Sequence, residues 1–216
     1  MTRKLPSTAS VAIAQDGAKL HAPAAARNAL ALSDLLVNNA PKAGRALEIA
    51  SGTGQHIVEF ATALPEIHWQ PTDIEAERLA SIDAHVAEAG LANVAPAAHL
   101  NASEAGWHGA TAPLDLIVLV NLLHLIPEAE VRTVITEAAL ALGPQGVLVL
   151  YGPFKREGRL TSDGDVRFDD QLRTADPAIG YKDTLDMYRW LGDAGMTAVR
   201  TIEMPANNLA FVARKI

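Results

Sequence analysis

The 216-residue chain contains no cysteine. Disulfide bonds, thiolate metal sites and cysteine nucleophiles are therefore excluded together. Aromatic residues make up only 5% of the chain, whereas 49% of it is hydrophobic, which favours helices packed on a sheet through small side chains. The seven histidines are dispersed, and the acidic residues of 163–170 lack the ligand spacing of a calcium loop. We therefore predict no metal site.

The chain also lacks clustered basic residues and long apolar runs. Its formal charge is −7, and its Lys and Arg residues are scattered, so no basic patch is expected to neutralise the phosphates of a nucleic acid. No apolar run approaches the length of a membrane span. Behind the basic residues 1–4, the apolar run 11–14 is too short for the core of a signal peptide. We expect a cytoplasmic protein with neither nucleic-acid nor membrane partners, and the sequence leaves its oligomeric state open.

Apolar runs and helical periodicities alternate along the chain. Residues 1–20 show no helical periodicity and are predicted to be a mobile lead-in. The predicted helices are 23–39, 54–64, 74–89, 128–142 and 184–194, and the predicted strands are 45–50, 67–72, 94–100, 114–120, 146–151, 196–203 and 209–214. This alternation predicts an α/β fold with a Rossmann-like, doubly wound, mostly parallel seven-stranded sheet. The short link 204–208 predicts a C-terminal antiparallel hairpin, and residues 1–216 are expected to form a single domain.

The stretch Glu48-Ile49-Ala50-Ser51-Gly52-Thr53-Gly54 joins a predicted strand to a predicted helix through small residues. Such a loop allows a ligand to lie against bare backbone. Asp73 stands 19 residues after Gly54, at the end of the next predicted strand. A carboxylate at that position can accept hydrogen bonds from both hydroxyls of a ribose. Loop and carboxylate together predict a nucleoside cofactor.

The loop does not have the third small residue of a dinucleotide fingerprint. That position is Ile57 when counted from Gly52 and Gln55 when counted from Ala50. Glu48, where the loop begins, is unfavourable for a phosphate and favourable for an ammonium group. S-adenosylmethionine has an ammonium group and a ribose but no phosphate, so it is the predicted cofactor.

Five segments carry a resemblance to a known family: residues 47–56 (LEIASGTGQH), 69–73 (WQPTD), 121–124 (NLLH), 151–154 (YGPF) and 204–209 (MPANNL). On these segments the chain resembles class I S-adenosylmethionine-dependent methyltransferases, and more narrowly the family that includes methyltransferase-like protein 26. The resemblance implies five parallel strands followed by an antiparallel hairpin. Ala50 stands where the superfamily usually has glycine. Asn101 stands where an acid often binds the adenine amino group, and its side-chain carbonyl can accept the same hydrogen bond.

The predicted cofactor-binding residues are Glu48, Ala50, Gly52, Thr53, Gly54, Asp73, Leu100, Asn101 and Asn121. Asn121 follows a buried strand, where open parallel sheets place their ligands. Structural alternatives remain for several of these residues. The glycines can serve a plain turn, Asp73 can cap a helix, Glu48 can pair with a surface cation, and Asn121 can form a strand-to-helix turn.

His124 is the predicted catalytic residue if the methyl acceptor must lose a proton, because imidazole titrates near neutrality. Packing is the alternative role for His124. Tyr151 and Phe154 are predicted to contact substrate through their rings, with core packing as the alternative. Asn207 is predicted to face the pocket, as the resemblance implies, or to form the hairpin turn. The polar residues 155–183 are predicted to form a solvated lid over the substrate.

These observations predict an S-adenosylmethionine-dependent methyltransferase that acts on a small molecule. A lid suits a small molecule better than DNA, and residues 121–124 lack the Asn-Pro-Pro-aromatic signature of amino-directed nucleic-acid methyltransferases. Three alternatives remain open: a cofactor-binding scaffold without catalysis, a nicotinamide-dependent dehydrogenase, and a methyltransferase acting on protein side chains. The sequence does not identify the acceptor atom.

Overall fold

A computed structural model describes residues 5–6, 8–111 and 113–216, and the basic residues 1–4 of the predicted lead-in lie outside this part. The strands are β1 (Ile13–Ala14), β2 (Leu20–His21), β3 (Gly44–Ile49), β4 (Ile67–Asp73), β5 (Ala98–His99), β6 (Leu114–Val120), β7 (Leu142–Lys155), β8 (Lys182–Asp183), β9 (Met196–Glu203) and β10 (Asn208–Lys215). The helices are α1 (Pro23–Asn39), α2 (Gln55–Ala63), α3 (Ala76–Ala89), α4 (His108–Thr111), the short 3-10 helix η1 (Leu123–Leu125), α5 (Glu128–Ala141), α6 (Asp163–Ala175) and α7 (Thr184–Asp193).

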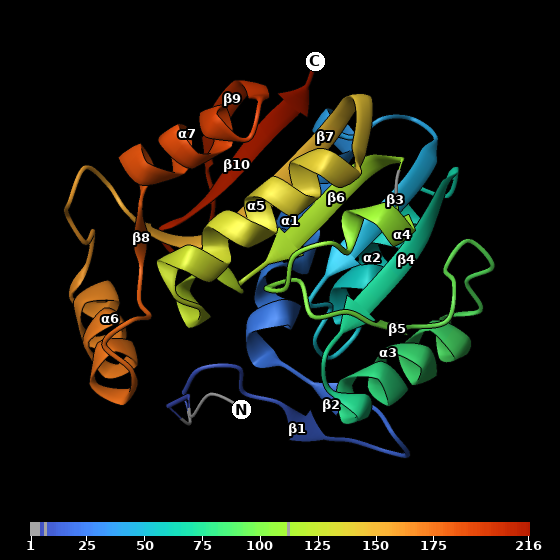
Figure 1. The fold of residues 1–216 in the computed structure, drawn as a ribbon. Helices are drawn as coiled ribbons and strands as arrows, with labels where there is room; N and C mark the ends of the chain where they lie inside the picture. Colours follow the sequence, from blue (N-terminus) through green and yellow to red (C-terminus); the bar gives the residue numbers. More distant parts are fainter. Residues whose placement is uncertain (1–4, 7, 112) are drawn as a thin grey trace.

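One mixed sheet forms the centre of the molecule (Figure 1), with the strand order β5-β4-β3-β6-β7-β10-β9. Strands β3 to β7 are parallel, and β10 is antiparallel to both β7 and β9. The predicted doubly wound sheet and C-terminal hairpin are therefore confirmed. The sheet has one strand more than predicted, because the two-residue β8 also pairs with β7.

The strand order reverses at β3, which has β4 on one side and β6 on the other. Chain connections leave β3 and β6 in opposite directions at such a switch point, and the resulting crevice lies outside their carboxyl ends. The loop that follows β3 therefore lies at the same crevice as Asn121, which follows β6. This topology brings together two parts of the predicted site that are far apart in sequence.

Helices cover both faces of the sheet, so its central strands are apolar on both sides. Helices α1, α2 and α3 pack on one face through Leu32, Phe60 and Ile82, and α4, α5 and α7 cover the other. Six of the seven residues of β6 are buried, which explains its almost continuous hydrophobic sequence. Within the part of the chain that the structure describes, no helix is both long and apolar enough to cross a membrane.

The third predicted strand, 94–100, is largely absent. Only β5 pairs with β4 as a ladder, and Val94 adds a single bridge to Trp69. Pro96 interrupts the predicted strand, and a proline has no N–H to contribute to a sheet ladder. The Gln70 side chain instead donates a hydrogen bond to the Pro96 carbonyl at 2.8 Å.

The predicted lid, residues 155–183, contains α6 and β8, and it is not wholly solvated. Asp169 on α6 is buried and accepts hydrogen bonds from the Tyr181 backbone N–H (2.7 Å) and from Arg173 Nε (2.9 Å). Lys155 Nζ lies 3.5 Å from the same carboxylate. The prediction of a solvated acidic cluster is wrong for Asp169, because these partners compensate a buried charge.

Candidate functional site

The loop after β3 is built on left-handed backbone. Ala50, Gly52 and Gly54 have φ angles of 54°, 62° and 90°. A Cβ on Gly54 would lie 2.7 Å from Ile82 Cα, so this glycine allows α3 to pack directly against the loop. A Cβ on Gly52 would meet nothing nearer than the Ala50 carbonyl oxygen at 3.9 Å. Gly54 is therefore required by packing, whereas the backbone at Gly52 is accessible to a ligand.

Asp73 joins the loop to the end of β4. Its Oδ2 accepts a hydrogen bond from the Gly52 N–H at 2.9 Å, and its Oδ1 accepts from the Ile74 and Glu75 N–H groups at 2.8 and 3.1 Å. Burial raises the pKa of Asp73, while the three backbone hydrogen bonds and the Arg78 charge oppose that shift. Asp73 thus orders the turn before α3 but is not its N-cap, which is Glu75, and it also lies beside the backbone of Gly52.

Glu48 lies near the end of β3, at the start of the loop, and it is only 1% exposed. Its Oε2 has no hydrogen-bond partner among the residues that the structure describes. Burial raises the pKa of Glu48 to about 8, with a smaller contribution from Asp73, while a hydrogen bond with Ser51 opposes the shift. The surface ion pair considered as an alternative is thus absent from the described structure. A buried carboxyl group of this kind favours a cationic ligand.

Helix α1 contributes a polar contact to the same edge. The Asn28 side-chain oxygen lies 2.7 Å from His56 Nε2 at the start of α2, and the His56 ring stacks on Phe60 with centroids 5.6 Å apart. Burial lowers the pKa of His56 to about 4, so the ring is neutral and donates from Nε2 to Asn28. This contact anchors α1 beside the loop.

The remaining predicted cofactor residues lie near Asp73 or the loop. Thr53 Oγ1 donates to Gln55 Oε1 at 2.9 Å, and the Leu100 N–H donates to the Asp73 carbonyl at 3.1 Å. The Asn101 side chain is engaged in its own turn. Its Oδ1 accepts from the Ser103 N–H at 3.2 Å, and its Nδ2 donates to Glu104 at 2.9 Å.

Asn121 and His124 both lie beside Gly152, which was not among the predicted site residues. Asn121 has a φ of 58°, and its N–H donates to the Tyr151 carbonyl at 2.9 Å. A Cβ on Gly152 would lie 3.6 Å from Asn121 Oδ1 and 3.8 Å from His124 Nδ1. A glycine inside a buried strand was the available signal, because such a residue often marks a close approach.

His124 is buried against the lid. Its ring makes edge contacts with Phe168 and Tyr181, with centroids 5.7 and 6.2 Å apart. Burial lowers the pKa of His124 to about 3, the Lys182 charge adds to this shift, and Asp169 opposes it. The imidazole is therefore neutral at physiological pH, and its environment disfavours the protonated form.

The three predicted substrate residues occupy different environments. Tyr151 is 1% exposed, and side-chain hydrogen bonds with Asn28 and Asn208 oppose the increase in its pKa that burial causes. Phe154 packs edge-on against Phe211 in the core, with centroids 5.0 Å apart. Asn207 has a φ of 61° in the exposed hairpin turn. The rings of Tyr151 and Phe154 are therefore packed in the core, and Asn207 lies in the hairpin turn.

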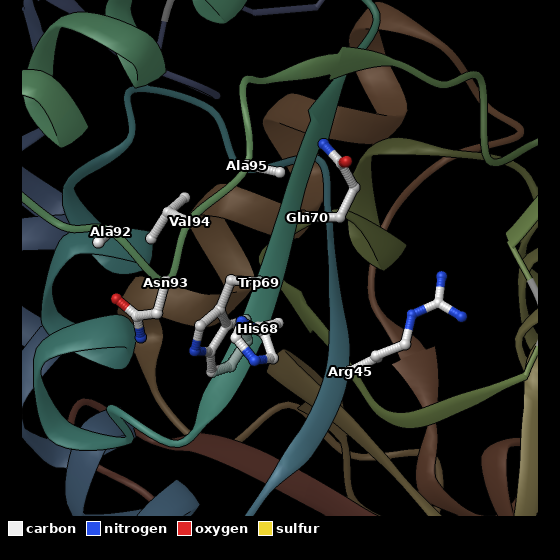
Figure 2. Close-up of a pocket in the computed structure, with 8 residues that line it drawn as sticks. All are labelled: Arg45, His68, Trp69, Gln70, Ala92, Asn93, Val94 and Ala95. Carbon is white, nitrogen blue, oxygen red and sulfur yellow. The ribbon is translucent and has the colours of Figure 1, made fainter.

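A pocket with a volume of about 310 Å³ lies apart from the residues described above (Figure 2). Arg45 and His68, near the amino ends of β3 and β4, contribute to its lining, and none of the predicted site residues does. It therefore lies apart from the crevice at the carboxyl ends. Among the described residues, no group of three or more His, Asp or Glu side chains is placed to hold a metal ion.

Sequence comparison places the chain in a family. A family model described as a protein of unknown function (DUF938) matches residues 19–215. The chain belongs to the DUF938 family. This description names no activity, and the comparison does not establish the narrower kinship with methyltransferase-like protein 26.

Several solved structures of methyltransferases have a similar fold. An O-methyltransferase family protein from Burkholderia thailandensis is 19% identical with a TM-score of 0.75, over 89% of this chain and 57% of its own. Human N-acetylserotonin methyltransferase, in complex with SAM, is 15% identical with a TM-score of 0.72, over 89% and 54%. An O-methyltransferase family 2 protein from Planctomyces limnophilus, in complex with apigenin, is 16% identical with a TM-score of 0.73, over 89% and 60%. The match therefore covers less than two thirds of each of these proteins, and at these identities it establishes the fold.

Proposed function

We propose that this protein is an S-adenosylmethionine-dependent methyltransferase acting on a small molecule. The observation that carries the proposal is the buried Glu48 carboxyl group, whose Oε2 lacks a partner in the described structure, at the start of a glycine loop. An ammonium group would pair with the ionised form of this group, whereas the phosphates of a dinucleotide would offer it no opposite charge. The fold shared with methyltransferases supports the same conclusion.

The residues around the loop fit the other parts of this cofactor. Asp73 retains acceptor capacity for ribose hydroxyls, since each carboxylate oxygen can accept more than one hydrogen bond. Asn101 Oδ1 has a second lone pair available for an adenine amino group, and Leu100 offers an apolar contact next to it. Gly52 leaves the backbone open on the side of the ligand. When bound, S-adenosylmethionine supplies an activated methyl group on a sulfonium.

The acceptor is proposed to lie at the carboxyl end of β6, near Asn121, His124 and Gly152. The protein's task there is to align the acceptor and exclude water. His124 is poorly suited to hold a proton, because burial and Lys182 disfavour its charged form. We therefore propose that His124 positions the acceptor through a neutral hydrogen bond. An acceptor atom that reacts without first losing a proton to the protein fits this site.

Several finer expectations belong to the same proposal. Helix α6 lies beyond the carboxyl end of the sheet, on the side of His124, where a lid would cover a small substrate (Figure 1). One protein of the same fold binds apigenin, which supports a small-molecule acceptor. The motifs 121–124 and 204–209 support kinship with methyltransferase-like protein 26. A cytoplasmic location belongs to the same proposal.

The test is calorimetric titration with S-adenosylhomocysteine and, separately, with NAD⁺. We expect S-adenosylhomocysteine to bind and NAD⁺ not to bind. Glu48→Gln should weaken binding at pH 8.5 by about tenfold or more, because a charge-assisted hydrogen bond contributes about 1.5–3 kcal/mol. Glu59→Gln, on α2, removes the same charge outside the site and should leave the affinity unchanged. Binding of NAD⁺ alone would overturn the proposal.

Turnover requires a second measurement. Incubation with labelled S-adenosylmethionine and fractionated small metabolites should give a labelled product that Asp73→Ala abolishes. Binding of S-adenosylhomocysteine without any labelled small molecule would favour the non-catalytic scaffold. Label recovered in protein would favour methylation of side chains.

A further inference from the structure

Residues 8–22, here called the strap, include most of the described part of the lead-in predicted at residues 1–20, and they make contacts that the sequence did not predict. Strands β1 and β2 within the strap pair in an antiparallel hairpin. Figure 1 shows the strap running beyond the carboxyl edge of the sheet, between α6 on one side and α3 on the other. The sequence did not predict these contacts, because they are made with residues distant in sequence, which periodicity does not reveal.

The first end of the strap is attached to the lid. Thr8 Oγ1 donates a hydrogen bond to Gln171 Oε1 on α6 at 3.0 Å. Ala9 is buried in a small apolar cluster with Leu172, Ile179 and Tyr181. The strap therefore shares a hydrophobic contact with the segment that packs on His124.

Two residues further on, the strap contacts α3. The carbonyl and hydroxyl oxygens of Ser10 accept hydrogen bonds from Arg78 Nη2 at 3.3 and 3.4 Å. Helix α6 follows β7 and α3 follows β4, and in the sheet β3 and β6 lie between these two strands. The strap, which joins α6 to α3, therefore runs past the carboxyl ends of β3 and β6 (Figure 1). Those ends carry the glycine loop and Asn121.

The second end of the strap is hydrogen-bonded to the glycine loop through one hydroxyl group. Ser81 on α3 is completely buried. Its Oγ accepts from the Leu20 N–H at 2.8 Å and donates to the Thr53 carbonyl at 2.8 Å. Leu20 on the strap and Thr53 in the loop therefore share a single partner.

Gln55 makes a second connection of the same kind. Its Oε1 accepts from the Ala22 N–H at 2.6 Å and from Thr53 Oγ1 at 2.9 Å, and its Nε2 lies 3.2 Å from His21 Nδ1. Both the carbonyl and the hydroxyl of Thr53 are thus linked to the strap. In contrast, the ion pair between Lys19 and Glu88 ties the strap to α3 without reaching the loop.

We propose that the strap is the outer wall of the cofactor site, and that strap docking and cofactor binding stabilise each other through Ser81 and Gln55. The ligand identity rests on the proposed function. When the strap is docked, its hydrogen bonds keep Thr53 and the glycine loop in one conformation. A ligand bound to the loop stabilises the same conformation. Each event therefore lowers the entropy cost of ordering the loop for the other. The cofactor leaves only when the strap opens, and strap opening limits its exchange.

The first test is amide hydrogen exchange on the full chain with and without S-adenosylhomocysteine. Peptides covering residues 8–22 should exchange at least about tenfold more slowly when the ligand is bound. Binding that protects the loop at residues 50–55 and leaves exchange in the strap unchanged would overturn the proposal while leaving the proposed function intact. Absence of any binding of S-adenosylhomocysteine would overturn both.

The second test measures the dissociation rate of S-adenosylhomocysteine by stopped flow. Ser81→Ala removes the shared hydroxyl and both of its buried hydrogen bonds, and we therefore expect dissociation at least about tenfold faster. Thr8→Val loosens the far end of the strap at an exposed position, and it should also accelerate dissociation although Thr8 is far from the loop in the hydrogen-bond network. Arg189→Gln is the control, because it removes an exposed ion pair with Asp186 within α7, away from the strap, and it should leave the rate within about twofold. Wild-type dissociation rates in both Ser81→Ala and Thr8→Val would overturn the proposal.

Discussion

At the scale of single residues, two non-glycine residues hold left-handed backbone at the crevice. Ala50 and Asn121 have positive φ angles directly after β3 and β6. Left-handed backbone at a residue with a Cβ costs roughly 1–2 kcal/mol, less for asparagine. Such strain concentrates at ligand sites, where the surrounding structure enforces it. Ala50 was noted from sequence as a departure from glycine, but its φ angle comes only from the fold.

The strain at Ala50 predicts a stabilising substitution. Ala50→Gly should increase the free energy of unfolding by about 1 kcal/mol, because glycine adopts positive φ without the Cβ penalty. Urea denaturation measures this change. Ala80→Gly, at an exposed position inside α3, should instead decrease the free energy of unfolding by about 1 kcal/mol. Equal destabilisation by both substitutions would contradict the strain at Ala50.

Glu48 predicts that ligand binding depends on pH. Its pKa of about 8, against an ordinary 4.5, means that the free protein holds the proton at pH 7, whereas an ammonium group on the ligand favours the carboxylate. Binding of S-adenosylhomocysteine should therefore release a proton at pH 7. Affinity should weaken as the pH falls below about 8, by up to about tenfold per pH unit. Calorimetry in buffers of different ionisation enthalpy measures the released proton. Glu48→Gln should abolish both effects, and proton uptake would contradict the assignment.

At the scale of elements, the glycine loop is shaped by its contact with α3. Gly54 lies so close to Ile82 that no side chain fits between them, whereas the backbone at Gly52 faces open space. The sequence motif did not distinguish the two glycines. The distinction arises because α3, which follows the next strand, packs on only one end of the loop.

Substitution of the two glycines should therefore have different effects. Gly54→Ala should decrease the free energy of unfolding by about 2–4 kcal/mol, since a Cβ would collide with Ile82 and positive φ adds strain. Gly52→Ala should lose only about 1–2 kcal/mol, from backbone strain, yet abolish measurable binding of S-adenosylhomocysteine. Chemical denaturation and calorimetry on the same samples separate the outcomes. A stable Gly52→Ala protein with wild-type affinity would argue against a ligand at this backbone.

Helix α6 was not predicted, although the sequence contains a signal for its start. Ser162 caps the helix, because its Oγ accepts a hydrogen bond from the Asp165 N–H at 3.1 Å, and acidic residues follow in the first turn. Serine followed by acids is a recognised helix start. The burial of Asp169 had no such signal, because its partners Lys155 and Tyr181 belong to other elements.

At the scale of the whole molecule, two buried histidines join elements across the carboxyl edge. His56 links α2 to α1 through Asn28, and His124 packs between β7 and the lid. Burial lowers the pKa of both rings, to about 4 and about 3. Both histidines are therefore neutral in the folded protein over a pH range in which the unfolded chain binds protons.

This difference predicts loss of stability in acid. A histidine whose pKa is depressed by folding contributes its full stability above the unfolded pKa of about 6.5, and the contribution is lost as the pH falls toward 3–4. The free energy of unfolding should therefore decrease between pH 6.5 and 4. Denaturation at a series of pH values measures the slope. Replacement of His56 or His124 by asparagine should make the slope shallower in each case, whereas His68→Asn, at an exposed position, should not change it.

The sequence by itself determined the order of the main strands and helices, the bounds of β6 and β9, and the loop that begins at Glu48. These features depend on local patterns, namely apolar runs, helical periodicity and glycines at a strand end. Only the tertiary structure decided that Gly152 lies beside Asn121 and His124, that Phe154 packs in the core, and that residues 8–22 link α6 to α3. Each of these depends on contacts between distant segments, which are set by strand order and packing and leave no periodic trace in the chain.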